Sequence, residues 1–173
     1  LETTLDFMLE DRIEFVVYNK QTDFKQSNIG LVTNDPNNIG GSARIVGSKV
    51  FIYFEGDHQV LEKQIKAAVA EALLNQWLYG GSWKDRVKSS TLLNLPDWYT
   101  KGLVFHLANQ WDYKSEEIFK DGILSGRYKK FSILEGKDAV LAGASIWKYV
   151  SESYGKEVIP NLVYLAQVSR NVE

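Results

Sequence analysis

The spacing of the apolar residues changes near residue 60, and this change limits the chain to folds with strands first and helices after. Two earlier runs, at 12–18 and 49–55, are rich in β-branched and aromatic residues and end in polar turn residues, which is typical of strands. Residues 42–46 predict another strand, joined as a hairpin to the run at 49–55 by Gly47 and Ser48. The sequence therefore predicts a β-rich segment over about residues 10–56.

After residue 60 the apolar residues follow helical spacing. Five of them fall at i, i+4 steps and predict one buried helix face: Leu61, Ile65, Val69, Leu73 and Trp77. Gly80 and Gly81 are expected to end this helix. A second helix is predicted from Pro96 and Asp97 to about residue 110, and two more over about 138–154 and 157–169. The order of elements predicts a single α+β domain over residues 1–173, helical at about 60–170.

Charge and composition exclude several classes of function. The 20 basic and 22 acidic residues form no basic run, so no nucleic-acid partner is predicted. The absence of cysteine excludes disulfides, thiolate metal ligands and a cysteine nucleophile. No stretch approaches the ~18 apolar residues of a membrane helix, so we expect no membrane-spanning segment. Because the sequence starts at Leu1, we expect it to be a domain excised from a longer chain.

Motifs for metal binding and nucleophilic catalysis are missing. The two histidines, His58 and His106, lie far apart in the sequence, so no H-x-x-x-H or H-E-x-x-H motif is present. We expect His58 to be a solvated turn residue and His106 to lie at the core edge or surface. Ser145 lacks the second glycine of G-x-S-x-G and falls in a helical pattern, and residues 40–42 indicate a flexible loop. No metal and no cofactor is predicted.

Aromatic residues are numerous, with five tryptophans and nine tyrosines. Core packing explains most of them. Trp83 and Trp111 fall on predicted loops or helix ends, where a tryptophan could also anchor a protein partner.

Two segments resemble the gluzincin-type zinc metallopeptidases. The helix around residues 65–75 is similar in position to the helix that carries H-E-x-x-H in that family. The run Leu95-Pro96-Asp97-Trp98-Tyr99-Thr100-Lys101-Gly102-Leu103 is similar to the family's L-P-x-W-[FY]-x-E-G-L/A helix start, which supplies the third zinc ligand. The resemblance spans about residues 10–110 and implies a zincin-like fold.

The resemblance also implies that the zinc site is degenerate. Aligning Glu71 with the general base places Ala70 and Leu74 at the two histidines, and Lys101 at the third ligand. A catalytic zinc needs three protein ligands, and neither alkyl groups nor an ammonium can serve. The chain is therefore expected to be a pseudopeptidase. If the family geometry persists, Glu71 and Lys101 face each other as a buried ion pair; the alternative is that both are solvated.

Three further segments, at 121–128, 143–149 and 168–173, resemble Bacteroidetes envelope proteins in which such a domain precedes a TolB-like β-propeller. This resemblance implies a periplasmic or outer-membrane location and a protein or peptide partner, with a C-terminal propeller of the same chain as one candidate. The expected partner cleft is floored by the helix at 61–79 and lined by Trp98, Tyr99, Trp83 and Trp111.

Three functions follow from these observations. The one we favour is a catalytically inactive peptidase-like domain that acts as a binding or structural module. The second is an active hydrolase with a relocated site involving His106; hydrolysis that depends on His106 would indicate it. The third is a passive spacer before a β-propeller, which would differ from a binding module because no partner would stabilise it.

Overall fold

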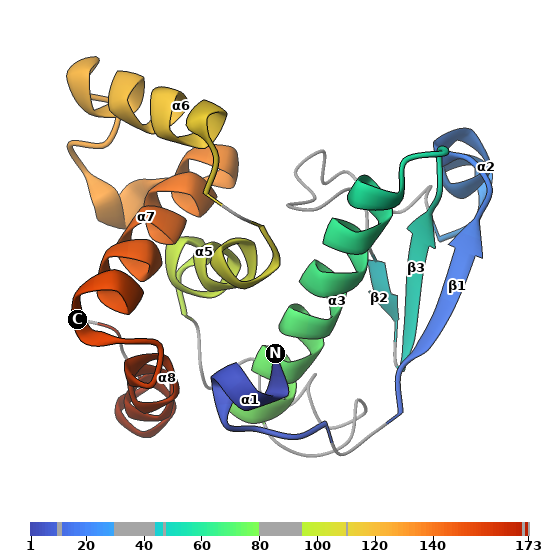
Figure 1. The fold of residues 1–173 in the computed structure, drawn as a ribbon, viewed down its shortest axis with the longest axis horizontal. Coiled ribbons are helices and arrows are strands. Elements are labelled where there is room, and N and C mark those ends of the chain that lie inside the picture. Colours follow the sequence, from blue (N-terminus) through green and yellow to red (C-terminus); the bar gives the residue numbers. More distant parts are fainter. Residues whose placement is uncertain are drawn as a thin grey trace.

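The computed structural model describes residues 1–9, 12–29, 44–46, 48–79, 95–109, 111–170 and 172. Its elements, in chain order, are α1 (Glu2–Leu5), β1 (Glu14–Tyr18), α2 (Gln21–Gln26), β2 (Arg44–Val46), β3 (Lys49–Tyr53), α3 (His58–Tyr79), α5 (Asp97–Ala108), α6 (Tyr113–Leu124), the 3₁₀ turn η1 (Phe131–Ile133), α7 (Gly136–Tyr154) and α8 (Val158–Ser169). Figure 1 shows the small sheet on one side of α3 and the later helices on the other. The predicted α+β class is confirmed, whereas the zincin-like assignment stays a prediction.

The sheet has three strands in the order β1-β3-β2. β2 and β3 pair antiparallel, with Ile45 opposite Val50, so the predicted strand pair is confirmed for the described residues 44–46 and 49–53. β1 joins the other edge of β3 in parallel, with Val16 opposite Phe51. Helix α2 covers the end of the sheet with Phe24, which is buried beside the rings of Tyr18 and Tyr53.

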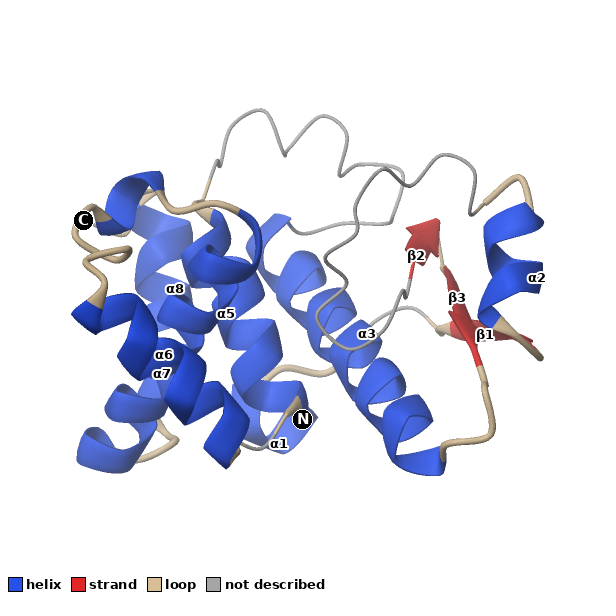
Figure 2. Cartoon of the chain, turned by 90° about the horizontal axis from the view of Figure 1, so that it is seen from above, coloured by secondary structure: helices blue, strands red, loops and turns tan. Residues whose placement is uncertain are grey.

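Helix α3 is buried on two sides, and here the prediction of a single apolar face was wrong. Of the predicted row, Leu73 is buried but Ile65 is 37% exposed. The sheet side is filled by Ala68, which packs with Val50 and Ile52. The opposite side belongs to a second core with α1, α5, α7 and α8. Helix α3 lies between the sheet and the later helices (Figures 1 and 2), so small residues on more than one side of it are buried. The single apolar stripe expected for a helix on the protein surface is therefore not seen in α3.

A polar side chain fixes the first turns of α3 to the sheet. Gln64 is fully buried, accepts a hydrogen bond from the Tyr53 N–H (3.3 Å) and donates one to the Tyr53 carbonyl (3.0 Å). Both bonds use backbone groups at the end of β3 that would otherwise be buried without partners. Gln64 therefore joins β3 to α3 by a pair of bonds that resembles strand pairing.

The helical half is held together by the contact between α5 and α7. Gly102 of α5 faces Gly143 of α7, and a Cβ built on Gly143 would lie 1.8 Å from the Trp98 carbonyl oxygen. Two helix backbones can approach this closely only where side chains are absent. The glycines thus set the distance between α5, which carries Lys101, and α7, the longest helix of the C-terminal half.

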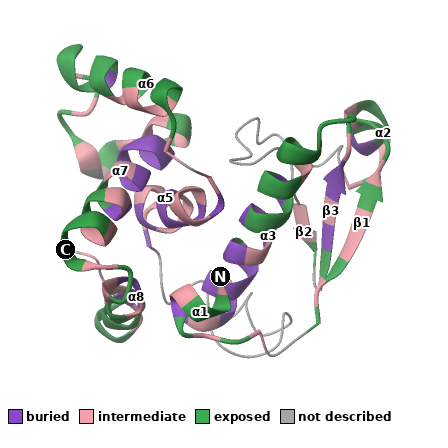
Figure 3. Cartoon of the chain, viewed as in Figure 1, coloured by how far each residue is buried: buried purple, intermediate pink, exposed green. Residues whose placement is uncertain are grey.

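The four helices predicted from apolar spacing are present, as α3, α5, α7 and α8, and Gly155, with φ of 87°, ends α7 as expected. The predicted ending at Gly80 and Gly81 lies outside the described residues. Helices α1, α2 and α6 were not predicted. The absence of α6 from the prediction matters most, because this helix carries many exposed side chains at one end of the molecule (Figure 3).

Candidate functional site

The positions aligned with the two zinc-binding histidines lie inside the core. Ala70 is fully buried and Leu74 is 2% exposed, and both belong to the apolar cluster formed with α5, α7 and α8. Since they are four residues apart on α3, they lie on one face of the helix, which is the arrangement that paired ligands on a helix require. In this chain that face carries a methyl group and an isobutyl group, and it packs as core.

Glu71 and Lys101, the charged positions of the predicted degenerate motif, lie near solvent. Glu71 is exposed on α3. The Lys101 ammonium contacts Asp97, one turn earlier on α5, with 2.8 Å between Nζ and Oδ2, and these side chains are 41% and 42% exposed. A pair so exposed contributes little to stability. The description of Lys101 as part of a buried pair is therefore wrong, and its hypothesised contact with Glu71 stays a prediction.

The two aromatic residues predicted to flank the cleft differ in accessibility. Tyr99 is a core residue: its ring packs against Trp147, its hydroxyl donates to the Leu162 carbonyl (2.9 Å), and burial raises the pKa of that hydroxyl. This burial places Tyr99 out of reach of a partner. Trp98 is half-buried and lies edge-on to Phe131 of η1, at 5.1 Å between ring centroids. Of these two residues, Trp98 is thus the one that retains accessible surface.

Of the other two tryptophans proposed for the cleft, the structure describes one. Trp83 lies outside the described residues. Trp111 precedes α6, where its indole N–H donates to Glu116 (2.6 Å) and its ring meets Phe119 edge-on. Two hydrogen bonds lower the pKa of Glu116, the one from Trp111 most and the one from Lys120 next. Trp111 therefore secures the start of α6.

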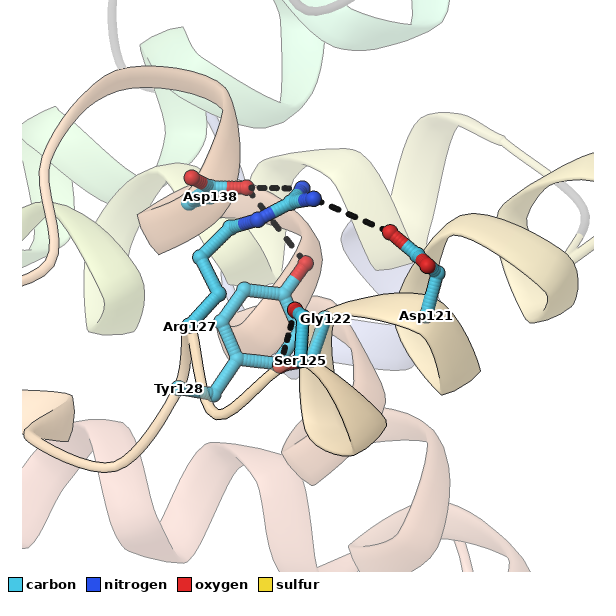
Figure 4. A network of polar contacts seen from close by, with 6 residues as sticks. All are labelled: Asp121, Gly122, Ser125, Arg127, Tyr128 and Asp138. Atoms are coloured by element: carbon cyan, nitrogen blue, oxygen red, sulfur yellow. Dashed lines mark hydrogen bonds and ion pairs between the residues drawn. The ribbon is translucent and has the colours of Figure 1, made fainter.

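A polar network fixes α6 to α7 (Figure 4). The Arg127 guanidinium, in the turn after α6, contacts Asp121 of α6 at 3.0 Å and Asp138 of α7 at 3.5 Å. Asp138 also lies 3.5 Å from the Tyr128 hydroxyl, whose pKa is raised first by burial and then by the Asp138 charge. The Tyr128 ring covers Gly122, where a Cβ would lie 2.4 Å from it. The inner face of α6 is thereby held in one position.

His106, the residue of the alternative hydrolase site, is half-buried on α5. Burial lowers the pKa of its imidazole most, Lys156 and Lys148 lower it further, and Glu152 opposes them. His106 is therefore neutral at pH 7, as a general base must be. In the part of the chain that the structure describes, however, no three His, Asp or Glu side chains gather in a way that could hold a metal ion.

Replacing His106 with glutamine is expected to reduce the dependence of stability on acid. Because the pKa of His106 is lowered in the folded protein, the unfolded chain binds the proton more readily. The free energy of unfolding is therefore complete above the ordinary histidine pKa of 6.5 and falls as pH drops below it. Urea unfolding at several pH values between about 5 and 8 should show a smaller loss for His106→Gln than for the wild type. His58→Gln makes the same substitution at the exposed start of α3 and is measured beside it as the control. An unchanged slope in His106→Gln would contradict the prediction.

Comparison with known proteins gives no match: no family model, no curated protein and no solved structure is similar to this chain. None of the described helices is long and apolar enough to cross a membrane.

Proposed function

We propose that this chain is a catalytically inactive, peptidase-like domain that acts as a binding or structural module in a bacterial envelope. The observation that carries the proposal is the packing of Ala70 and Leu74, at the positions of the two zinc ligands, in a core with α5. A gluzincin site needs imidazoles on this face and a carboxylate at Lys101 to hold zinc and activate water. The side chains present here stabilise the contact between the helices instead.

A binding role is supported by apolar side chains that remain exposed in the C-terminal part of the domain. Five of them, on the last turns of α7 and on α8, are more than half exposed: Tyr149, Tyr154, Tyr164, Leu165 and Val168. Isolated exposed apolar residues are common, but tyrosines are enriched at protein interfaces because they combine a large apolar area with a polar group. The envelope location rests on the resemblance of the C-terminal segments alone.

The experiment is to measure zinc content and hydrolysis on the purified chain. We expect less than about one-tenth of a zinc per chain, no rise in melting temperature on adding zinc, and no turnover of peptide or ester substrates. We expect these results because no three His, Asp or Glu side chains that could hold a metal ion come together among the residues that the structure describes. Stoichiometric zinc, or hydrolysis that His106→Ala abolishes, would overturn the proposal in favour of a relocated active site. Failure of the chain to fractionate with envelope proteins would contradict the location only.

A further inference from the structure

The outward face of α6 carries a four-residue stripe. Tyr113, Glu117, Lys120 and Leu124 follow one another at steps of four, three and four residues, the spacing of the contact seam in a coiled coil. All four side chains point away from the core: Tyr113 is 82% exposed, Leu124 is 87% exposed, and the Lys120 side chain is 67% exposed. Glu117 is exposed as well. We refer to these four residues as the α6 seam.

The seam is complementary to itself. When two helices pack antiparallel about a two-fold axis that passes midway between Ile118 and Phe119, each residue meets the residue at the same distance on the other side of the midpoint. Tyr113 then faces Leu124 of the other copy, and Glu117 faces Lys120. The two-fold axis repeats each contact, so the seam makes two apolar and two opposite-charge contacts. Shifting the seam by one turn would remove this match.

Contacts within the domain hold α6 in a fixed position with the seam facing outward. Asp112 caps the helix by accepting a hydrogen bond from the Ser115 N–H (2.8 Å), and the network of Arg127 and Tyr128 holds its inner face against α7. Lys120 also lies 3.2 Å from Glu116, but an ammonium has three donors and can contact a second carboxylate. The seam is thus presented on a fixed helix, and little order has to be gained on contact.

We propose that the α6 seam binds the α6 seam of a second copy of this chain, forming an antiparallel two-helix contact. One short helix per chain gives a contact at the small end of protein interfaces, so the dimer is weak and reversible, with a Kd on the order of 100 µM. This inference goes beyond the proposed function and is independent of it, because it holds whether or not the chain once carried a zinc site.

The first test is the mass of the 173-residue chain by sedimentation equilibrium over about 10 µM to 1 mM. We expect the average mass to rise from 19.7 kDa towards twice that value with increasing concentration. Glu117→Lys and Lys120→Glu each place like charges opposite one another twice, and each should raise Kd by about tenfold or more. Lys114→Glu makes the same charge change on a different face of α6 and should leave Kd unchanged.

Mixing separates this contact from other causes of association. The Glu117→Lys seam is positive at both positions and the Lys120→Glu seam is negative at both, so the two variants should bind each other more tightly than either variant binds itself. The double variant Glu117→Lys/Lys120→Glu restores opposite charges and should dimerise like the wild type. Circular dichroism should show the same helix content in the variants as in the wild type. A wild type that is monomeric at 1 mM, or variants that fail to bind on mixing, would overturn the proposal.

Discussion

Gly143→Ala is expected to destabilise the domain by about 3 kcal/mol or more, although it adds only a single methyl group. The added Cβ would lie 1.8 Å from the Trp98 carbonyl oxygen and 2.6 Å from its carbonyl carbon. Both atoms belong to the backbone of α5, so no rotation of a side chain can relieve the overlap. The two helices must separate, and the contacts of Trp147 and Tyr99 across the same interface weaken with them.

Urea unfolding followed by circular dichroism measures this effect. Ser153→Ala is the matched control, because it also introduces an alanine into α7 but at an exposed position. It should change the free energy of unfolding by less than about 0.5 kcal/mol. Gly102→Ala, whose Cβ would meet the Gly143 backbone at 2.7 Å, should destabilise the domain in the same direction. If Gly143→Ala and the wild type unfold at the same midpoint urea concentration, the backbones of α5 and α7 do not approach each other as closely as described.

Local sequence signals were sufficient where one element determines its own structure. Strands β1 and β3 and helices α5, α7 and α8 lie within a few residues of their predicted positions, because β-branched runs, an N-terminal proline and a C-terminal glycine act within a few residues of themselves. The parallel pairing of β1 with β3 could not be predicted in this way, since it depends on how residues far apart in the sequence are brought together.

Helix α6 was missed because its apolar residues serve two surfaces. Gly122 is its one buried residue, while Tyr113, Ile123 and Leu124 are exposed, so no single apolar face appears in the sequence. One signal was present. An aspartate directly before a helix often accepts a hydrogen bond from the backbone N–H three residues later. Asp112 does so here, with the Ser115 N–H as donor. This capping residue indicates where α6 begins.

The candidate site shows a different limit. The spacing of Ala70 and Leu74 predicts that they share a helix face, and they do, but spacing cannot tell whether that face lines a cleft or fills a core. That choice depends on what packs against α3, and the partner is α5, more than twenty residues later in the sequence. Likewise, Trp98 and Tyr99 were predicted to line the cleft together, although neighbouring residues on a helix point in different directions.

Replacing Trp147, which is buried, should also lower the free energy of unfolding by a large amount. It is 2% exposed, its ring meets Tyr99 edge-on at 5.0 Å, and its indole N–H donates to the Tyr99 carbonyl at 2.9 Å. Tyr99 in turn donates its hydroxyl to Leu162 of α8. Trp147 therefore joins α7 to α5, and through Tyr99 to α8, so its loss affects three helices.

Trp147→Ala should lower the free energy of unfolding by about 3–5 kcal/mol, and Trp147→Phe by about 2 kcal/mol, because phenylalanine fills part of the space but removes the buried hydrogen bond from the indole N–H to the Tyr99 carbonyl. Trp111→Phe removes the same kind of bond, the one to Glu116, at a half-exposed site where water can replace the indole N–H. This control should lose less than about 1 kcal/mol. Circular dichroism in urea is the appropriate measurement, since tryptophan fluorescence changes with the substitutions themselves. Equal losses for Trp147→Phe and Trp111→Phe would mean that the bond to Tyr99 is accessible to water, and that α5 and α7 are packed less tightly than their glycines require.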